Sequence, residues 1–227
     1  MASRDDIAIA VRDLTVRFGS VKAVDGVSFE VRRGETFALV GESGSGKTTT
    51  ARALAGLVKP SGGDFSLSGR IGMVFQDPLG SLNPRRTVRE IVRSRVDLLE
   101  ETGLGRGALD RYPHEFSGGE RQRICIARAL ATEPSILICD EAVSALDLSV
   151  RSQVLDLLAQ TKRRHSLTML FINHDLGVVQ HVADRIAVMR EGRIVEQGAA
   201  DEVLRHPKAE YTKILVASVP RIGAGPL

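Results

Sequence analysis

Apolar and polar residues alternate along two stretches near the start of the chain, residues 7–18 and 27–31, as they do in strands with one exposed face. An unbroken apolar run at residues 36–40 predicts a fully buried strand that ends at Gly41. Shorter apolar runs predict further strands at residues 71–75, 135–139, 167–172, 185–190 and 193–197. The pattern therefore predicts a small antiparallel start followed by a series of buried strands.

Helical spacing of apolar residues appears in the intervals between these strands. It predicts helices at residues 47–57, 87–99, 118–131, 150–164 and 175–183. Thr87 with Glu90 three residues later matches a capping box, which favours a helix start at Thr87. Because strands alternate with helices, we expect an α/β protein with a mostly parallel sheet, helices on both faces and a small antiparallel β-lobe.

The length of the chain fits one domain, residues 1–227, with modest appendages. No strand pattern appears between Gln76 and Ser117, so residues 77–133 are predicted to form a helical lobe beside the sheet. Residues 207–227 are predicted to be a docked helix with a frayed tail.

Composition narrows the classes of protein that fit. Hydrophobic residues make up 43% of the chain but aromatic residues only 4%, so the core must rest on aliphatic side chains, as in a buried parallel sheet. Lys and Arg number 31 against 28 Asp and Glu, and this balance gives no reason to expect a nucleic-acid partner.

Cys125 and Cys139 lie in apolar stretches and are interpreted as small buried hydrophobic residues. No signal peptide or membrane-spanning stretch is visible, so any membrane role requires other chains.

An arginine cluster stands out within this balanced charge: Arg85, Arg86, Arg89, Arg93 and Arg95. A solvated helix face is the favoured interpretation. A site for a polyanion, and a surface that faces a partner or lipid headgroups, remain alternatives.

The sharpest local signal is residues 41–48, which read Gly-Glu-Ser-Gly-Ser-Gly-Lys-Thr and match G-x-x-x-x-G-K-[ST] between a buried strand and a helix. In this context the backbone N–H groups and the helix N-terminus face phosphate oxygens. Lys47 is expected to reach the β- and γ-phosphates and Thr48 to ligate Mg²⁺. The predicted nucleotide-binding residues are Gly41, Glu42, Ser43, Gly44, Ser45, Gly46, Lys47, Thr48 and Thr49. The alternative is a glycine-rich turn; the motif instead favours a P-loop NTPase fold that binds a nucleoside triphosphate and Mg²⁺.

Two carboxylates follow the apolar strand at residues 135–139. Strands of a parallel sheet present their carboxyl ends at the ligand crevice. Asp140 is therefore predicted to hold Mg²⁺, and Glu141 to polarise the water that attacks the γ-phosphate. An acidic N-cap for the next helix is the alternative.

Residues 116–122, Phe-Ser-Gly-Gly-Glu-Arg-Gln, resemble the signature motif of ABC (ATP-binding cassette) ATPases. Other family positions match in order: Gln76 resembles the Q-loop glutamine, Asp147 the D-loop aspartate, His174 the switch histidine, and Phe18 the aromatic residue that stacks on adenine. The resemblance covers about residues 7–220. Asp147 also fits the N-cap of the helix that follows, where Ser149 competes with it.

The resemblance implies a head-to-tail dimer in which ATP lies between the phosphate loop of one subunit and Ser117, Gly118 and Gly119 of the other. It assigns catalytic roles to Glu141, His174, Lys47 and Gln76, and a metal-sensing role to Gln76 beside Thr48 and Asp140. Asp147 is implied to contact the facing subunit as part of the nucleotide site.

Several segments are similar to the oligopeptide and dipeptide importer ATPases, a pattern shared with nickel importers. These segments are residues 75–78, 81–85, 111–119 and 192–198 and the pairs His206-Pro207 and Tyr211-Thr212. The implied partners are transmembrane permease subunits, a second identical or different ABC ATPase and, indirectly, a solute-binding protein. The implied location is the cytoplasmic face of the membrane. An ABC ATPase acting on nucleic acid or ribosomes, and a regulatory cassette with weak turnover, are the alternatives.

Two departures from the family pattern bear on these expectations. Glu120 stands where the signature usually has Gln; it is expected to face solvent, with slowed closure of the dimer as the alternative. The stretches between Gly56 and Gln76 and between Arg95 and Arg111 are short, which predicts a trimmed β-lobe and a shortened helical lobe.

Overall fold

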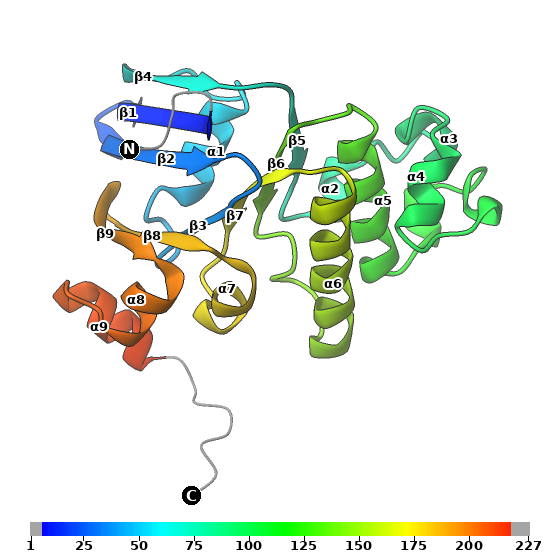
Figure 1. Ribbon diagram of the computed structural model, residues 1–227. Coiled ribbons are helices and arrows are strands. Elements are labelled where there is room, and N and C mark those ends of the chain that lie inside the picture. The colour runs from blue at the N-terminus through cyan, green and yellow to red at the C-terminus, as the bar shows by residue number, and fades with distance from the viewer. Residues whose placement is uncertain (1–5, 219–227) are drawn as a thin grey trace, which may run out of the picture.

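The computed structural model describes residues 6–218 and contains two sheets (Figure 1). One hydrophobic cluster lies between the two sheets, and a second covers the other face of the larger sheet. The smaller sheet is antiparallel, in the order β2-β1-β4, and pairs β1 (Ile7–Phe18) with β2 (Val21–Arg32) and β4 (Gly62–Leu67). Alternating buried and exposed residues along β2 show that one face of this sheet meets the core. The small antiparallel unit expected from the sequence is confirmed.

The larger sheet has six strands in the order β5-β6-β7-β3-β8-β9. Its strands are β5 (Ile71–Val74), β6 (Ile136–Asp140), β7 (Thr168–Ile172), β3 (Thr36–Val40), β8 (Arg185–Arg190) and β9 (Arg193–Ala199). All neighbours are parallel except β8 and β9, and β3, β6 and β7 are buried along their whole length. The mostly parallel sheet is therefore confirmed, and its carboxyl-end edge carries the predicted site.

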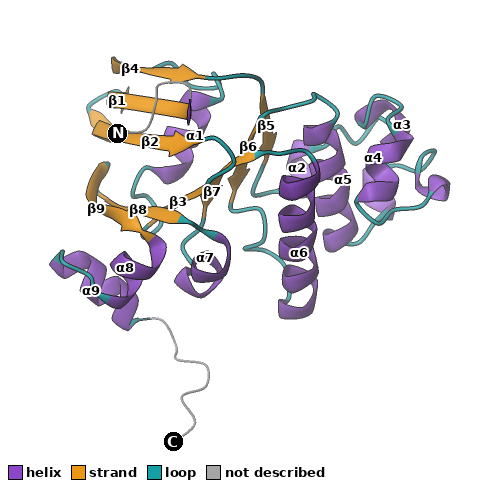
Figure 2. Cartoon of the chain, viewed as in Figure 1, coloured by secondary structure: helices purple, strands orange, loops and turns teal. Residues whose placement is uncertain are grey.

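Helices lie on both faces of this sheet (Figure 2). On one face, α1 (Lys47–Leu54) packs between the two sheets, where Ala51, Ala53 and Leu54 join the core formed by β1 and β2. The other face is covered by α5 (Gly118–Leu130), α6 (Leu148–Arg164), α7 (Leu176–Val182), α8 (Ala200–Arg205) and α9 (Glu210–Ala217). The aliphatic core follows from the composition, and both cysteines are buried and outside any disulfide bond, as expected.

Residues 77–133 contain helices and no strand, as the sequence indicates. Besides α5 they form α2 (Pro78–Ser81), α3 (Val88–Ile91), α4 (Val96–Glu101) and 3-10 turns at Arg106–Ala108 and Pro113–Glu115. Figure 1 shows α3 and α4 on the far side of α5 from the sheet. Buried residues such as Leu98 and Leu99 join this lobe to the core beneath α5.

The single helix predicted at residues 87–99 is wrong. The Thr87–Glu90 capping box does start α3, with Thr87 N–H donating to Glu90 Oε2 at 2.8 Å. Arg93 and Ser94, however, have φ values of 53° and 60°, and residues in this left-handed region cannot continue a right-handed helix. The chain therefore turns, and α4 starts separately at Val96.

Other boundaries also differ from the predictions. The first helix ends at Leu54 instead of residue 57, because Gly56 has a φ of 73° and turns the chain. Strand β4 and helices α2 and α8 have no counterpart among the predictions. The tail predicted beyond α9 includes residues 219–227, which lie outside the described residues.

Candidate functional site

The phosphate loop joins the end of β3 to the start of α1, and its glycines are required by close backbone contacts. Gly41 has a φ of 144°, and a Cβ there would lie 2.1 Å from the carbonyl oxygen of Met189. Gly46 has a φ of 103°, and a Cβ would lie 2.4 Å from the carbonyl oxygen of Ala23. Side chains at these two positions would push the loop away from β8 and β2, so only glycine permits this path.

Lys47 lies at the centre of the loop and is 4% exposed. Its Nζ donates to the carbonyl oxygens of Gly41 at 2.8 Å and Glu42 at 2.7 Å, and to Ser45 Oγ at 3.3 Å. Burial lowers the pKa of Lys47, while the nearby carboxylates of Glu141 and Asp140 act in the opposite direction. The loop thus surrounds a buried ammonium group, at the position where the motif predicts phosphate.

Thr48 and Asp140 meet although they are far apart in the sequence. Thr48 Oγ1 donates to Asp140 Oδ1 at 2.8 Å, which joins the first turn of α1 to the last residue of β6. Burial raises the pKa of Asp140, which is 1% exposed, and the hydrogen bond from Thr48 partly offsets this rise.

This pair fits a magnesium ion. Mg²⁺ is usually held by one or two carboxylates together with substrate phosphates and water. Within residues 6–218 no three His, Cys, Asp or Glu side chains form a metal-binding cluster. A hydroxyl and one carboxylate beside a phosphate loop are instead the donor set that such a shared ion takes.

Three further predicted residues follow three neighbouring parallel strands. Gln76 comes after β5, Glu141 after β6 and His174 after β7. Gln76 Nε2 donates to Glu141 Oε2 at 3.0 Å, and His174 Nδ1 lies 3.5 Å from the same oxygen. Glu141 is buried, whereas about half of the His174 side chain is exposed. The Glu141 carboxylate therefore lies between the amide of Gln76 and the partly exposed ring of His174.

Phe18 lies at the end of β1, opposite Val21 of β2, and is 54% exposed. The same hairpin reaches the phosphate loop, since Ala23 of β2 is the residue whose carbonyl oxygen crowds Gly46. An aromatic ring with this exposure has a free face for a base to stack on.

The signature residues lie elsewhere, at the start of α5. A Cβ at Gly119 would lie 2.5 Å from Val150 Cγ1, so this end of α5 abuts the first turn of α6. Asp147 caps α6 by accepting from Val150 N–H at 3.0 Å, which decides the competition with Ser149. Between residues 6 and 218, no hydrogen bond or ion pair joins Ser117, Gly118, Gly119 or Asp147 to the phosphate loop of the same chain.

Glu120 does not simply face solvent. Its Oε2 accepts from both the N–H and the hydroxyl of Ser117, each at 2.8 Å. These bonds, the one from the backbone N–H first, lower the pKa of Glu120 and keep it ionised at neutral pH. The negative charge of Glu120 therefore lies within hydrogen-bond distance of Ser117, the serine of the signature.

Sequence reasoning missed two supports of the phosphate loop. Gly192 N–H donates to the carbonyl oxygen of Ser45 at 3.0 Å, and the N–H of Glu42 donates to Tyr211 Oη at 3.1 Å. In the sequence, Tyr211 stands out only through the similarity of the Tyr211-Thr212 pair to the importer ATPases. Nothing in the local pattern of residues indicates that α9 reaches the loop.

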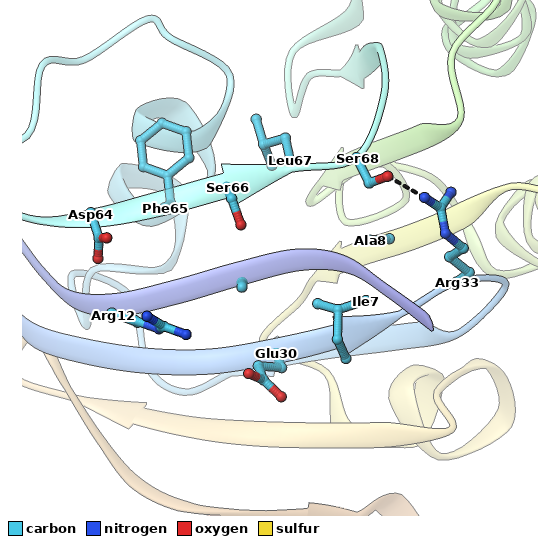
Figure 3. Close-up of a pocket in the computed structure, with 11 residues that line it drawn as sticks. Ile7, Ala8, Arg12, Glu30, Arg33, Asp64, Phe65, Ser66, Leu67 and Ser68 are labelled. Carbon is cyan, nitrogen blue, oxygen red and sulfur yellow. Dashed lines mark hydrogen bonds between the residues drawn. The ribbon is translucent and has the colours of Figure 1, made fainter. Parts of the chain in front are cut away.

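A cavity of about 510 Å³ lies apart from these residues, along the antiparallel sheet (Figure 3). Arg12, Glu30, Asp64 and Phe65 are among its lining residues, and a hydrogen bond from Arg33 to Ser68 closes one end. It shares no lining residue with the predicted site. The site is therefore defined by its hydrogen bonds and not by this cavity.

The fold and the phosphate loop together define the class of protein, a P-loop nucleoside triphosphatase. The ABC transporter family model matches residues 24–144. The oligopeptide transport ATP-binding protein OppF of Salmonella typhimurium is 47% identical over 88% of this chain and 70% of its own length. The chain therefore belongs to the ABC transporter family, and it is an ATP-binding subunit that hydrolyses ATP.

Solved structures agree with this assignment. The structure of cbiO1 from Clostridium perfringens, part of the ABC transporter complex cbiONQ, is 30% identical, with a TM-score of 0.79 over 88% of this chain and 92% of that one. A dimeric ATP-binding cassette in a post-hydrolysis state bound to ADP and Pi is 24% identical, with a TM-score of 0.74 over 85% of this chain and 98% of that one; it shares the fold. Subunits of this kind associate with membranes, and the helices within residues 6–218 are too short or too polar to cross one.

Proposed function

We propose that this chain is the motor of a membrane importer for peptides or similar small solutes. The observation that carries the proposal is the constellation at the carboxyl edge of the sheet, where Thr48 meets Asp140 and Glu141 meets Gln76 and His174. The peptide class of solute is supported by the relative at 47% identity, which is an oligopeptide transport protein.

Lys47, Thr48, Asp140 and Gln76 are proposed to hold the triphosphate and a magnesium ion. When bound, the ion neutralises charge on the phosphate oxygens. Lys47 already donates to loop carbonyls, so its ammonium group needs only a change of hydrogen-bond partner to reach a phosphate. Asp140 accepts from Thr48, which holds both oxygen ligands on the same side of the loop.

Glu141 is proposed to be the general base. Its Oε2 is fixed by the amide of Gln76, so the carboxylate is oriented before the water arrives. His174, on the exposed side, is proposed to contact the γ-phosphate and to sense whether it is present.

The remaining predicted residues are proposed to act across a head-to-tail dimer. In the described part of the chain, no hydrogen bond or ion pair joins Ser117, Gly118, Gly119 or Asp147 to the phosphate loop. The start of α5 offers N–H groups to an anion. A facing subunit is proposed to bring its loop to this helix terminus, with Phe18 stacking on the adenine. Closure would then require ATP and be released by hydrolysis, which moves the attached permeases.

The proposed partners are transmembrane permease subunits, a second ABC ATPase, identical or different, and a solute-binding protein that acts through the permeases. The proposed location is the cytoplasmic face of the membrane.

The test is reconstitution in proteoliposomes of this ATPase with its candidate permeases and solute-binding protein. We expect ATP hydrolysis to be stimulated when the binding protein is loaded with a short peptide, and labelled peptide to accumulate. The matched control is Lys47→Ala, which keeps the subunit but removes its ammonium group. Peptide accumulation that is independent of ATP, or equal with Lys47→Ala, would contradict the proposal.

A further inference from the structure

The C-terminal helix α9 reaches the phosphate loop through one side chain. Tyr211 lies in its first turn, is 8% exposed, and its Oη accepts from the N–H of Glu42 at 3.1 Å. The two residues are 169 positions apart in the sequence. This hydrogen bond is partly buried, and because it joins the last described helix to the second residue of the loop it constrains where the loop begins.

The ring of Tyr211 is itself held at the end of β8. The guanidinium carbon of Arg190, the last residue of that strand, lies 5.0 Å from the ring centroid, a cation–π arrangement. The preceding residue, Met189, supplies the carbonyl oxygen that excludes a side chain at Gly41. The ring and the loop thus rest against the same strand end.

The start of α9 is anchored as well. Glu196 of β9 accepts from the N–H groups of Lys208 and Ala209 at 2.9 and 3.0 Å, one on each carboxylate oxygen. These bonds fix the residues just before α9 to the edge strand of the sheet. Tyr211 therefore projects from a helix terminus that is attached to the rigid part of the molecule.

The peptide that Tyr211 holds is also the one that Lys47 contacts. Lys47 Nζ donates to the carbonyl oxygen of Glu42 at 2.7 Å, while Tyr211 accepts from the N–H of the same residue. Glu42 is thus gripped at both of its backbone polar groups. A shift of this residue would move the ammonium group and the loop amides that follow.

We propose that Tyr211 is a positioning residue for ATP binding. It keeps the phosphate loop and Lys47 in the shape that receives the triphosphate, before any nucleotide is present, and so reduces the free energy that ATP must spend on ordering the loop. The role concerns binding and not the chemical step, since within residues 6–218 no hydrogen bond or ion pair joins Tyr211 to Glu141 or Asp140.

The test is Tyr211→Phe in the 227-residue chain, which keeps the ring and removes the hydroxyl. Loss of this one hydrogen bond predicts a rise of about threefold to tenfold in KM for ATP and in the dissociation constant of a fluorescent ATP analogue. The kcat is expected to stay within about twofold. The matched control is Tyr112→Phe, since Tyr112 is the other tyrosine of the chain and is exposed; it should change neither quantity.

A lower melting temperature with unchanged KM and nucleotide affinity would show a merely structural bond and overturn the proposal. A fall in kcat at unchanged KM would overturn it too. If Tyr211→Phe gives little folded protein, Arg190→Gln weakens the same support without removing the hydroxyl. It should raise KM for ATP in the same direction but less, and an unchanged KM there would contradict the role.

Discussion

Thr48 Oγ1 donates a hydrogen bond of 2.8 Å to Asp140 Oδ1. The bond places the two predicted metal ligands side by side, one from α1 and one from the end of β6. Asp140→Asn keeps the shape but removes the charge, and Thr48→Val removes the hydroxyl. Because each change deletes one oxygen ligand or its support, we expect the Mg²⁺ concentration for half-maximal ATPase activity to rise about tenfold or more. Titration of activity with Mg²⁺ at saturating ATP measures this. Equal Mg²⁺ dependence in the wild type and both variants would show that Thr48 and Asp140 do not bind the ion.

Glu141→Gln tests the base. The amide keeps an oxygen for the bond from Gln76 but cannot take a proton from water. We expect turnover to fall at least about 100-fold, while ATP affinity stays within about twofold of the wild type. Steady-state hydrolysis and equilibrium nucleotide binding separate the two effects. Turnover close to that of the wild type would show that another group takes the proton.

Glu120→Gln removes the negative charge from Ser117 but leaves an oxygen that its hydroxyl can donate to. If the γ-phosphate of a facing subunit approaches Ser117, loss of the repulsion should lower KM for ATP about twofold to fivefold. The difference in KM between Glu120→Gln and the wild type should become smaller at high salt, because screening weakens the repulsion in the wild type. Glu133→Gln, at an exposed position beyond the other end of α5, is the control and should have no effect. An unchanged KM at low salt would mean that the charge of Glu120 does not meet the nucleotide.

The two signature glycines differ in packing and so should respond differently to alanine. A Cβ at Gly119 would lie 2.5 Å from Val150 Cγ1, and β-branched valine has little rotameric freedom in a helix. Gly119→Ala is therefore expected to destabilise the fold by about 1–3 kcal/mol. Gly118→Ala meets nothing within 4 Å and should leave stability close to that of the wild type. Thermal or urea denaturation of the purified variants decides this, and equal stability of the two would contradict the packing argument.

Docking of α9 should depend on pH through Glu196. Burial favours the neutral form of this carboxyl, but the hydrogen bonds from Lys208 and Ala209 outweigh it and hold its pKa below the usual value of 4.5. A lowered folded-state pKa contributes stability that is present above the unfolded pKa and is lost as pH falls through the folded one. Glu196→Gln, which leaves one of the two N–H groups unpaired, should lower Tm by about 2–4 °C at neutral pH.

The difference in Tm between Glu196→Gln and wild type should narrow as pH falls below about 4.5. The protection factors of the amide hydrogens in α9, which correct for the slower intrinsic exchange in acid, should fall over the same range. If the difference in Tm stays constant down to pH 3, the ionised carboxylate of Glu196 is not what stabilises the docking of α9.

Much of the fold follows from local patterns. The buried strands at residues 36–40 and 168–172 are almost entirely apolar, the spacing of apolar residues predicts the helix that begins at Gly118, and the capping box of Thr87 and Glu90 predicts the start of α3. The predictions failed where a local pattern is ambiguous. Residues 87–99 have helical spacing throughout, yet Arg93 and Ser94 turn the chain. Strand β4 is too rich in glycine and polar residues to stand out from a loop.

The sequence by itself determined the phosphate loop, because the glycine spacing, the lysine and the flanking strand and helix are contiguous. It also identified Gln76, Glu141 and His174 as candidates, each following an apolar run. Only the tertiary structure decided that these three meet. The strands β5, β6 and β7 are neighbours in the sheet as well as along the chain, but β4 pairs in the other sheet and β3 lies between β7 and β8, so chain order alone does not fix which strands are neighbours. The same holds for Tyr211 and Glu42, whose hydrogen bond spans 169 positions. Local periodicity encodes which face of an element is buried, whereas contacts between distant residues depend on how all the elements pack together.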